Sequence, residues 1–138
     1  MNIRFSIFFI LTSMILFNSC EKDKDENTMD SISGIWYLKN VNGGLAGIDL
    51  DYTRDQVKWT FDHSKLKLNV ENNIMTTGPE DIYAGLDTGV YNYEVREDKQ
   101  IKTLYVENNK KGVIIIVNDN LKLDDNVASD GLITEFER

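Results

Sequence analysis

Few side chains in this sequence are suited to catalysis. The chain of 138 residues contains one histidine, His63, and one cysteine, Cys20. Asp62-His63-Ser64 has the residue types of a catalytic triad, but a triad needs side chains that converge in space from separate positions. These three residues are consecutive and separate two stretches of alternating polar and apolar residues, which indicates a hairpin turn. We therefore expect no catalytic residue, and we predict that the protein is not an enzyme.

Acidic residues form two candidate metal sites. The segment 49–51 carries two aspartates near Asp55, and Asp124-Asp125 lies near Asp119. Neither group has the glycine and terminal glutamate of an EF-hand loop, and Ca²⁺ takes about six to eight oxygen ligands. Aspartate is also common in turns because its side chain bonds the nearby backbone. We expect no metal and no other cofactor, and calcium binding at these turns is the alternative.

Cys20 separates an apolar segment from a charged one. The chain starts with a short basic stretch that contains Arg4, and residues 5–17 are mainly apolar. A basic start and a short apolar stretch are typical of a secretory signal peptide. The apolar stretch is shorter than the roughly 20 residues that a membrane-spanning helix needs. Directly after Cys20, residues 21–26 are all charged.

The residues around Cys20 resemble a lipobox, the cleavage and lipidation site of bacterial lipoproteins. Ser19 directly before Cys20 fits this motif, whereas Phe17 and Asn18 depart from its usual small residues. The resemblance implies a signal peptide at 1–19, a lipid on Cys20, a charged tether at 20–29 and a folded domain at 30–138. It also implies attachment to the bacterial outer membrane, facing the periplasm or the cell surface. The alternative is an ordinary signal peptide followed by an unpaired cysteine.

The remaining chain is long enough for one domain, and its pattern predicts an all-β fold. The formal net charge of −8 disfavours nucleic acid as a partner, and we expect a monomer. Alternation of polar and apolar residues, together with short polar turns between apolar stretches, marks about eight strands: 34–41, 57–61, 66–70, 91–96, 101–106, 113–117, 121–123 and 132–136.

Short polar turns between these strands require antiparallel neighbours. Closure of such a meander removes the free edges, so we predict a small up-and-down antiparallel β-barrel. A two-sheet sandwich is the alternative. Two longer segments, 42–52 and 71–87, are expected to be loops, and the apolar residues of the first are expected to plug one end of the barrel.

Three short motifs carry a resemblance to the lipocalins. Gly34-Ile35-Trp36 resembles the Gly-x-Trp signature that opens their first strand. With Cys20, the chain is similar to small bacterial lipoproteins that carry a lipocalin-like domain. The domain is shorter than a typical lipocalin, and it lacks their disulfides and the helix after the last strand. The corresponding motifs of this chain are Gly34-x-Trp36, Trp59-x-Phe61 and Phe136-x-Arg138.

This resemblance implies a particular contact and a class of function. The signature tryptophan, Trp36, should pack at the closed end of the barrel under a basic residue of the last strand, for which Arg138 is the candidate. A stacked guanidinium lies within about 6 Å of the ring centre. The implied function is non-enzymatic binding of a small apolar or amphipathic molecule. The alternative is an interaction, inhibitor or accessory module of the bacterial envelope that acts through its loops.

Aromatic residues of the predicted interior are the candidates for ligand binding. An eight-stranded barrel can be filled by side chains or can hold one small ligand. A buried tyrosine combines an apolar ring with a hydroxyl that needs a partner. Tyr91, Tyr93 and Trp59 are therefore the predicted ligand-binding residues, and packing of the core is the alternative role.

Lipidation at Cys20 can be tested directly. We expect Cys20→Ser to release the protein from membranes or to leave the leader uncleaved, because the modified side chain is lost. Membrane fractionation and intact mass measure the two effects. Unchanged fractionation together with normal processing would show that Cys20 is not the anchor.

Overall fold

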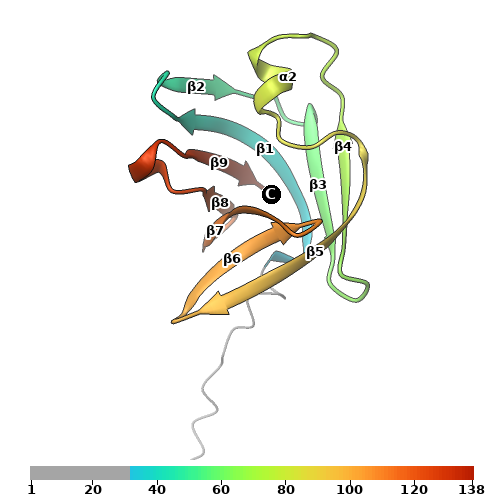
Figure 1. The fold of residues 1–138 in the computed structure, drawn as a ribbon. Coiled ribbons are helices and arrows are strands. Elements are labelled where there is room, and N and C mark those ends of the chain that lie inside the picture. Colours follow the sequence, from blue (N-terminus) through green and yellow to red (C-terminus); the bar gives the residue numbers. More distant parts are fainter. Residues whose placement is uncertain (1–31) are drawn as a thin grey trace, which may run out of the picture.

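Eight antiparallel strands form a closed barrel, and one further strand extends it, in the computed structural model of the protein (Figure 1). It describes residues 32–138, so the predicted signal peptide, the tether and Cys20 lie outside the described residues. In chain order the elements are β1 (Gly34–Gly43), β2 (Ile48–Asp51), β3 (Val57–Asp62), β4 (Lys67–Asn72), α2 (Pro79–Tyr83), β5 (Gly89–Asp98), β6 (Ile101–Val106), β7 (Asn109–Val117), β8 (Asn120–Asp124), the 3₁₀ helix η1 (Val127–Ser129) and β9 (Leu132–Glu137).

The barrel closes through pairing of β1 with β9. From β3 to β9 each strand pairs with the next one along the chain, and β1 lies between β3 and β9. The closing pairs run from Tyr37↔Glu137 to Gly43↔Leu132. Closure leaves neither β1 nor β9 as a free edge. The predicted barrel is confirmed, and the sandwich alternative is wrong.

Tight turns set the register of the central hairpins. Lys99 and Gln100 join β5 to β6, and Glu107 and Asn108 join β6 to β7. All four residues have positive φ, as the two central residues of a type I′ turn require. Such turns match the right-handed twist of the paired strands, which explains why these hairpins need no longer loop.

The first predicted loop contains β2, which the sequence interpretation missed. Ile48 and Leu50 are partly buried, whereas Asp49 and Asp51 are exposed, so the segment does alternate. β2 pairs with β1 from Asn40↔Asp51 onwards. Four residues next to a glycine-rich turn are too short for this alternation to stand out in the sequence.

The second predicted loop contains α2. Pro79 occupies the first turn of this helix, where its missing N–H costs no hydrogen bond. Glu80 and Asp81 in the same turn complement the positive end of the helix dipole. Five residues are too few to show a helical period. Within residues 32–138, no helix has the length and apolar character needed to cross a membrane.

β7 begins earlier than predicted. It starts at Asn109, whereas the sequence interpretation placed a turn over 108–112. A bulge explains the difference: Leu104 pairs with Gly112 and Tyr105 with Lys110, which leaves Lys111 as the extra residue. Gly112 has φ +141°, and a Cβ there would lie 2.9 Å from the backbone nitrogen of Asp124. The glycine therefore serves the bulge and not a hairpin turn.

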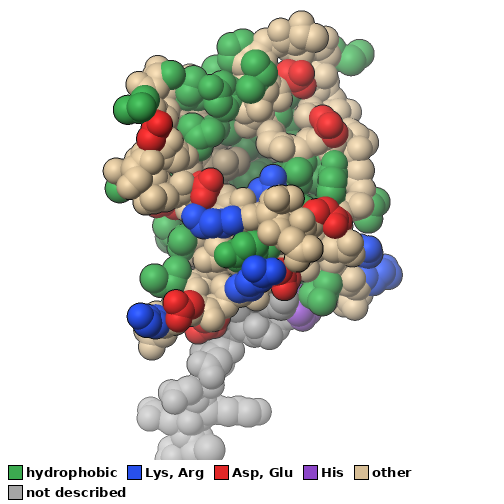
Figure 2. Space-filling view, viewed as in Figure 1, with side chains coloured by type: hydrophobic (Ala, Val, Ile, Leu, Met, Phe, Trp, Pro, Cys, Tyr) green, Lys and Arg blue, Asp and Glu red, His purple; other side chains and the backbone are tan. Residues whose placement is uncertain are grey.

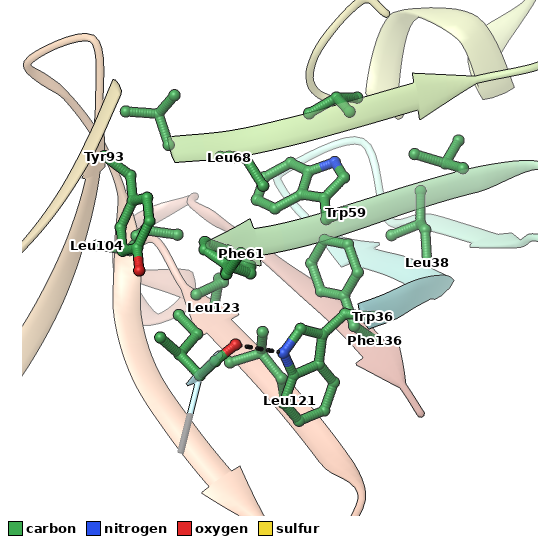
Figure 3. Close-up of a cluster of buried hydrophobic side chains, with 14 of the residues drawn as sticks. Trp36, Leu38, Trp59, Phe61, Leu68, Tyr93, Leu104, Leu121, Leu123 and Phe136 are labelled. Atoms are coloured by element: carbon green, nitrogen blue, oxygen red, sulfur yellow. Dashed lines mark hydrogen bonds between the residues drawn. The ribbon is translucent and has the colours of Figure 1, made fainter. Parts of the chain in front are cut away.

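The interior of the barrel is filled mainly by apolar side chains. Figure 3 shows rings from β1, β3, β5 and β9 that point into the same space. The ring centroids of Trp59 and Phe136 are 4.8 Å apart, and those of Phe61 and Tyr93 are 5.0 Å apart. The 17 buried apolar residues are Ile32, Trp36, Leu38, Val41, Tyr52, Val57, Trp59, Phe61, Leu68, Val70, Ala84, Tyr93, Leu104, Val106, Leu121, Leu123 and Phe136.

Trp36 and Arg138 form one end of the barrel, which we call the closed end. Trp36 is fully buried, and its indole Nε1 donates a hydrogen bond to the Ile32 carbonyl at 2.7 Å. The guanidinium carbon of Arg138 lies 4.0 Å from the Trp36 ring centroid, so the predicted stacking is confirmed. Arg138 also donates from Nη2 to the Ser33 carbonyl and from its backbone N–H to the Asp119 carbonyl.

Removal of the last three residues tests this end of the barrel. We expect deletion of 136–138 to cost more than about 3–5 kcal/mol, the usual loss for one buried phenyl ring. Arg138→Ala should cost about 0.5–2 kcal/mol from the cation–π contact. Urea unfolding measures both.

A matched control is Lys122→Ala, which removes an exposed ion pair with Glu135 and should cost less than about 1 kcal/mol. If Arg138→Ala costs no more than Lys122→Ala, the stacked guanidinium does not stabilise the barrel.

Candidate functional site

Three segments surround the opposite end of the barrel, and we call them the rim. They are 44–51, which contains the β1–β2 turn and β2; 73–88, which contains α2; and 125–131, which contains η1. β1 starts beside Trp36 at the closed end and runs to Gly43, so the rim lies one strand length away from Arg138. Figure 1 shows α2 and β2 at the top and the start of β1 below them.

Two hydrogen bonds to backbone carbonyls join the segments of the rim, one of them donated by Tyr52, which directly follows β2. The Gly44 N–H donates to the Gly131 carbonyl at 3.0 Å, which fastens the β1–β2 turn to the loop around η1. The Tyr52 hydroxyl donates to the Glu80 carbonyl at 2.9 Å, which fastens α2 to the end of β2. The rim is therefore one connected surface.

Tyr91, a predicted ligand-binding residue, helps to hold the rim. Its ring lies on the inner face of β5, and its hydroxyl donates to the Asp87 carbonyl at 2.9 Å. Asn72 of β4 donates from Nδ2 to the Leu86 carbonyl, also in the segment after α2. These two contacts fix the chain where it crosses from α2 to β5. The structure thus gives the Tyr91 hydroxyl a backbone partner.

Trp59 and Tyr93, the other two predicted ligand-binding residues, lie inside the barrel and are each 3% exposed. The ring of Phe61 contacts both rings. Among residues 32–138, neither the Trp59 Nε1 nor the Tyr93 hydroxyl has a hydrogen-bond partner. Burial, and then the charge of Asp62, raise the pKa of Tyr93. Within the described residues, these two buried polar atoms therefore lack the hydrogen bonds that would compensate for their burial.

Lys111 is a partly buried charged residue in the β7 bulge, directly before the buried Gly112. As the extra residue of the β7 bulge it stands with Gly112 opposite Leu104, whose side chain is fully buried. Lys111 is half-buried, and its burial lowers the pKa of the ammonium group although Asp125 opposes the shift. The sequence did not single out Lys111, because a lysine in an expected turn normally faces water.

Large apolar side chains of the rim face solvent. Leu45 is 91% exposed, Met75 97% and Ile82 74%. The prediction that the apolar residues of 42–52 plug the barrel is correct for Tyr52, which is buried, and wrong for Leu45. In sequence the two residues look equivalent, and only their position in the fold separates them.

Two depressions flank α2. One, of about 330 Å³, lies beside Tyr83 and is lined also by Leu45, Ile48, Leu132 and Asp130. The other, of about 240 Å³, lies beside Ile82. Its further lining includes Leu86, Asp81 and Asp87. Each depression therefore combines apolar side chains with carboxylates.

The described acidic groups do not form a metal centre. Within residues 32–138, no three His, Cys, Asp or Glu side chains are close enough together to hold a metal ion. The side chains of Asp49 and Asp51 each accept a hydrogen bond from the Asn40 amide instead. His63 lies in the β3–β4 turn, and the Asp62 carboxylate there binds Ser64 and Lys65.

Comparison with protein families, curated proteins and solved structures finds no match to this chain. The function is therefore inferred from the barrel topology and the rim.

The Tyr52–Glu80 contact predicts a specific pH dependence. Burial, and then the charge of Glu80, raise the pKa of Tyr52 from its usual 10.0 to about 12. In the unfolded chain Tyr52 ionises near pH 10, whereas the folded state keeps it neutral, so its contribution to stability is full below pH 10 and is lost between pH 10 and 12. Tyr52→Phe should cost about 1 kcal/mol at pH 8, because the hydrogen bond is lost.

Urea unfolding at pH 8 and at pH 11 measures this difference. The variant should lose less stability than the wild type over this interval. Tyr83→Phe, also in the rim, is the control and should change stability by less than about 0.5 kcal/mol. If the wild type and Tyr52→Phe lose the same free energy of unfolding between pH 8 and pH 11, Tyr52 is not the source of the pH dependence.

Proposed function

We propose that this protein is a lipid-anchored lipoprotein of the bacterial outer membrane, and that its lipocalin-like barrel is a non-enzymatic interaction module that binds another protein through the rim. The observation that supports this most is the contrast between a packed interior and exposed apolar side chains at one end. Isolated apolar residues on a surface are ordinary, but a cluster beside depressions is typical of an interaction site. Leu45 and Ile82 each line one of the two depressions beside α2, and Met75 is exposed in the same rim segment as α2.

The orientation of the barrel supports the same proposal. The described chain begins at Ile32, whose carbonyl accepts the Trp36 hydrogen bond at the closed end. An anchor at Cys20 would be 12 residues away, a reach of about 40 Å at most. The tether would then join the barrel at its closed end. The rim would lie at the opposite end, where a partner can approach.

A second candidate function is binding of a small apolar or amphipathic molecule inside the barrel. Two uncompensated polar atoms favour it, the Trp59 Nε1 and the Tyr93 hydroxyl, because buried polar groups normally have partners. Lys111 could pair with an acidic head group of such a molecule. We place it second because the interior already holds the buried side chains of Trp36, Trp59, Phe61, Tyr93 and Phe136.

Photo-crosslinking in cells tests the proposed function. A benzophenone amino acid replaces Leu45 or Ile82 in the full-length protein, and the same amino acid at Ile115, an exposed apolar position on the barrel wall, is the control. We expect a discrete protein adduct from the two rim positions and none from Ile115. Adducts of equal yield at all three positions, or none at the rim, would contradict the proposal.

Native mass spectrometry of the gently purified protein tests the second candidate. A bound small molecule that is lost in Trp59→Phe would favour the interior site over the rim.

A further inference from the structure

The rim is acidic as well as apolar. Its three segments, 44–51, 73–88 and 125–131, contain no lysine and no arginine. On the face shown in Figure 2, acidic and hydrophobic side chains occupy the upper part, and most Lys and Arg side chains lie in the lower half. Of the seven carboxylate residues in these segments, Asp125 forms an ion pair with Lys110 of β7 at 2.8 Å. The other six are Asp49, Asp51, Glu80, Asp81, Asp87 and Asp130.

These carboxylates alternate with the exposed apolar side chains. Glu80 and Asp81 directly precede Ile82 in α2, and Asp81 and Asp87 line the same depression as Ile82. On the other side of α2, Asp130 lines the groove that contains Leu45, and its carboxylate accepts a hydrogen bond from the Leu45 N–H. Apolar and negative groups are therefore close enough for one ligand to contact both.

We propose that the rim binds a cationic amphipathic polypeptide segment, which places apolar side chains beside Leu45 and Ile82 and lysine or arginine opposite Asp81, Asp87 and Asp130. This inference rests on the proposed function, since it names the class of partner for the same surface. Complementary charge speeds encounter and excludes wrong partners, while burial of the apolar side chains supplies most of the affinity.

The same charges argue against other occupants. A membrane surface is rich in anionic head groups, which the rim carboxylates would repel. A second copy of this chain would bring two acidic rims together, and like charges across an interface cost free energy. A neutral apolar molecule would have no charged group to pair with the rim carboxylates.

Designed peptides test the class of partner. The probe is a 14-residue peptide of leucine and lysine with leucines at helical spacing. One comparison peptide replaces every lysine with glutamate, and the other replaces every leucine with serine. The full-length protein is held in nanodiscs of zwitterionic phosphatidylcholine, and the signal from empty discs is subtracted. We expect only the leucine–lysine peptide to bind, with an affinity that falls at least about tenfold between low and high salt.

Variants locate the binding site. Asp81→Asn combined with Asp87→Asn should weaken binding several-fold and flatten its salt dependence. Ile82→Ser should weaken binding at every salt concentration. Asp98→Asn and Ile115→Ser, exposed acidic and apolar positions away from the rim, are the controls and should bind as the wild type does.

The outcomes separate this inference from the proposed function. Crosslinks at Leu45 and Ile82 without binding of the leucine–lysine peptide would overturn the inference and leave the interaction site standing. Equal binding of the glutamate peptide, or binding that the rim variants do not change, would also overturn it. Failure of both crosslinking and peptide binding would remove the proposed function as well.

Discussion

The pairing of β9 with β1 is the interaction on which the rest of the structure depends. Without it both strands would be edges, and the apolar faces of Leu38 and Phe136 would open to water. Arg138 stabilises the closed end of the barrel. Its guanidinium stacks on Trp36, and it donates hydrogen bonds to the carbonyls of Ser33 and Asp119. Arg138 thus joins the first strand, the last strand and the β7–β8 turn.

The two halves of β1 belong to opposite ends of the barrel. The first half pairs with β3 and is buried at the closed end, whereas the second half pairs with β2 and ends in the rim. β2 is not needed for closure, because β1 already pairs with β3 and β9. The β1–β2 turn with Leu45 can therefore differ in sequence without disturbing the barrel. Such an arrangement, with variable loops on a rigid scaffold, is common among binding proteins.

Much of the fold could be predicted from the sequence, and less of the candidate site. Alternation and the polar turns between apolar stretches identified all eight barrel strands, and the resemblance carried by Trp36 and Arg138 identified the closing contact. β2 and α2 were missed because four or five residues carry too little periodicity. Trp59 and Tyr93 lie in the interior, as alternation indicated. The exposure of Leu45 depends on contacts between distant segments, which no local pattern records.

The distance in sequence between the closing partners affects how the chain folds. Seven of the antiparallel pairs join strands that are consecutive in the chain and can form locally, whereas Tyr37 pairs with Glu137, about a hundred positions away. Long-range pairing of this kind slows folding, because the ends must meet before the contacts stabilise them. Since β9 is synthesised last, no shorter nascent chain can complete the barrel. Until β9 is available, the edge of β1 that pairs with it has no partner strand.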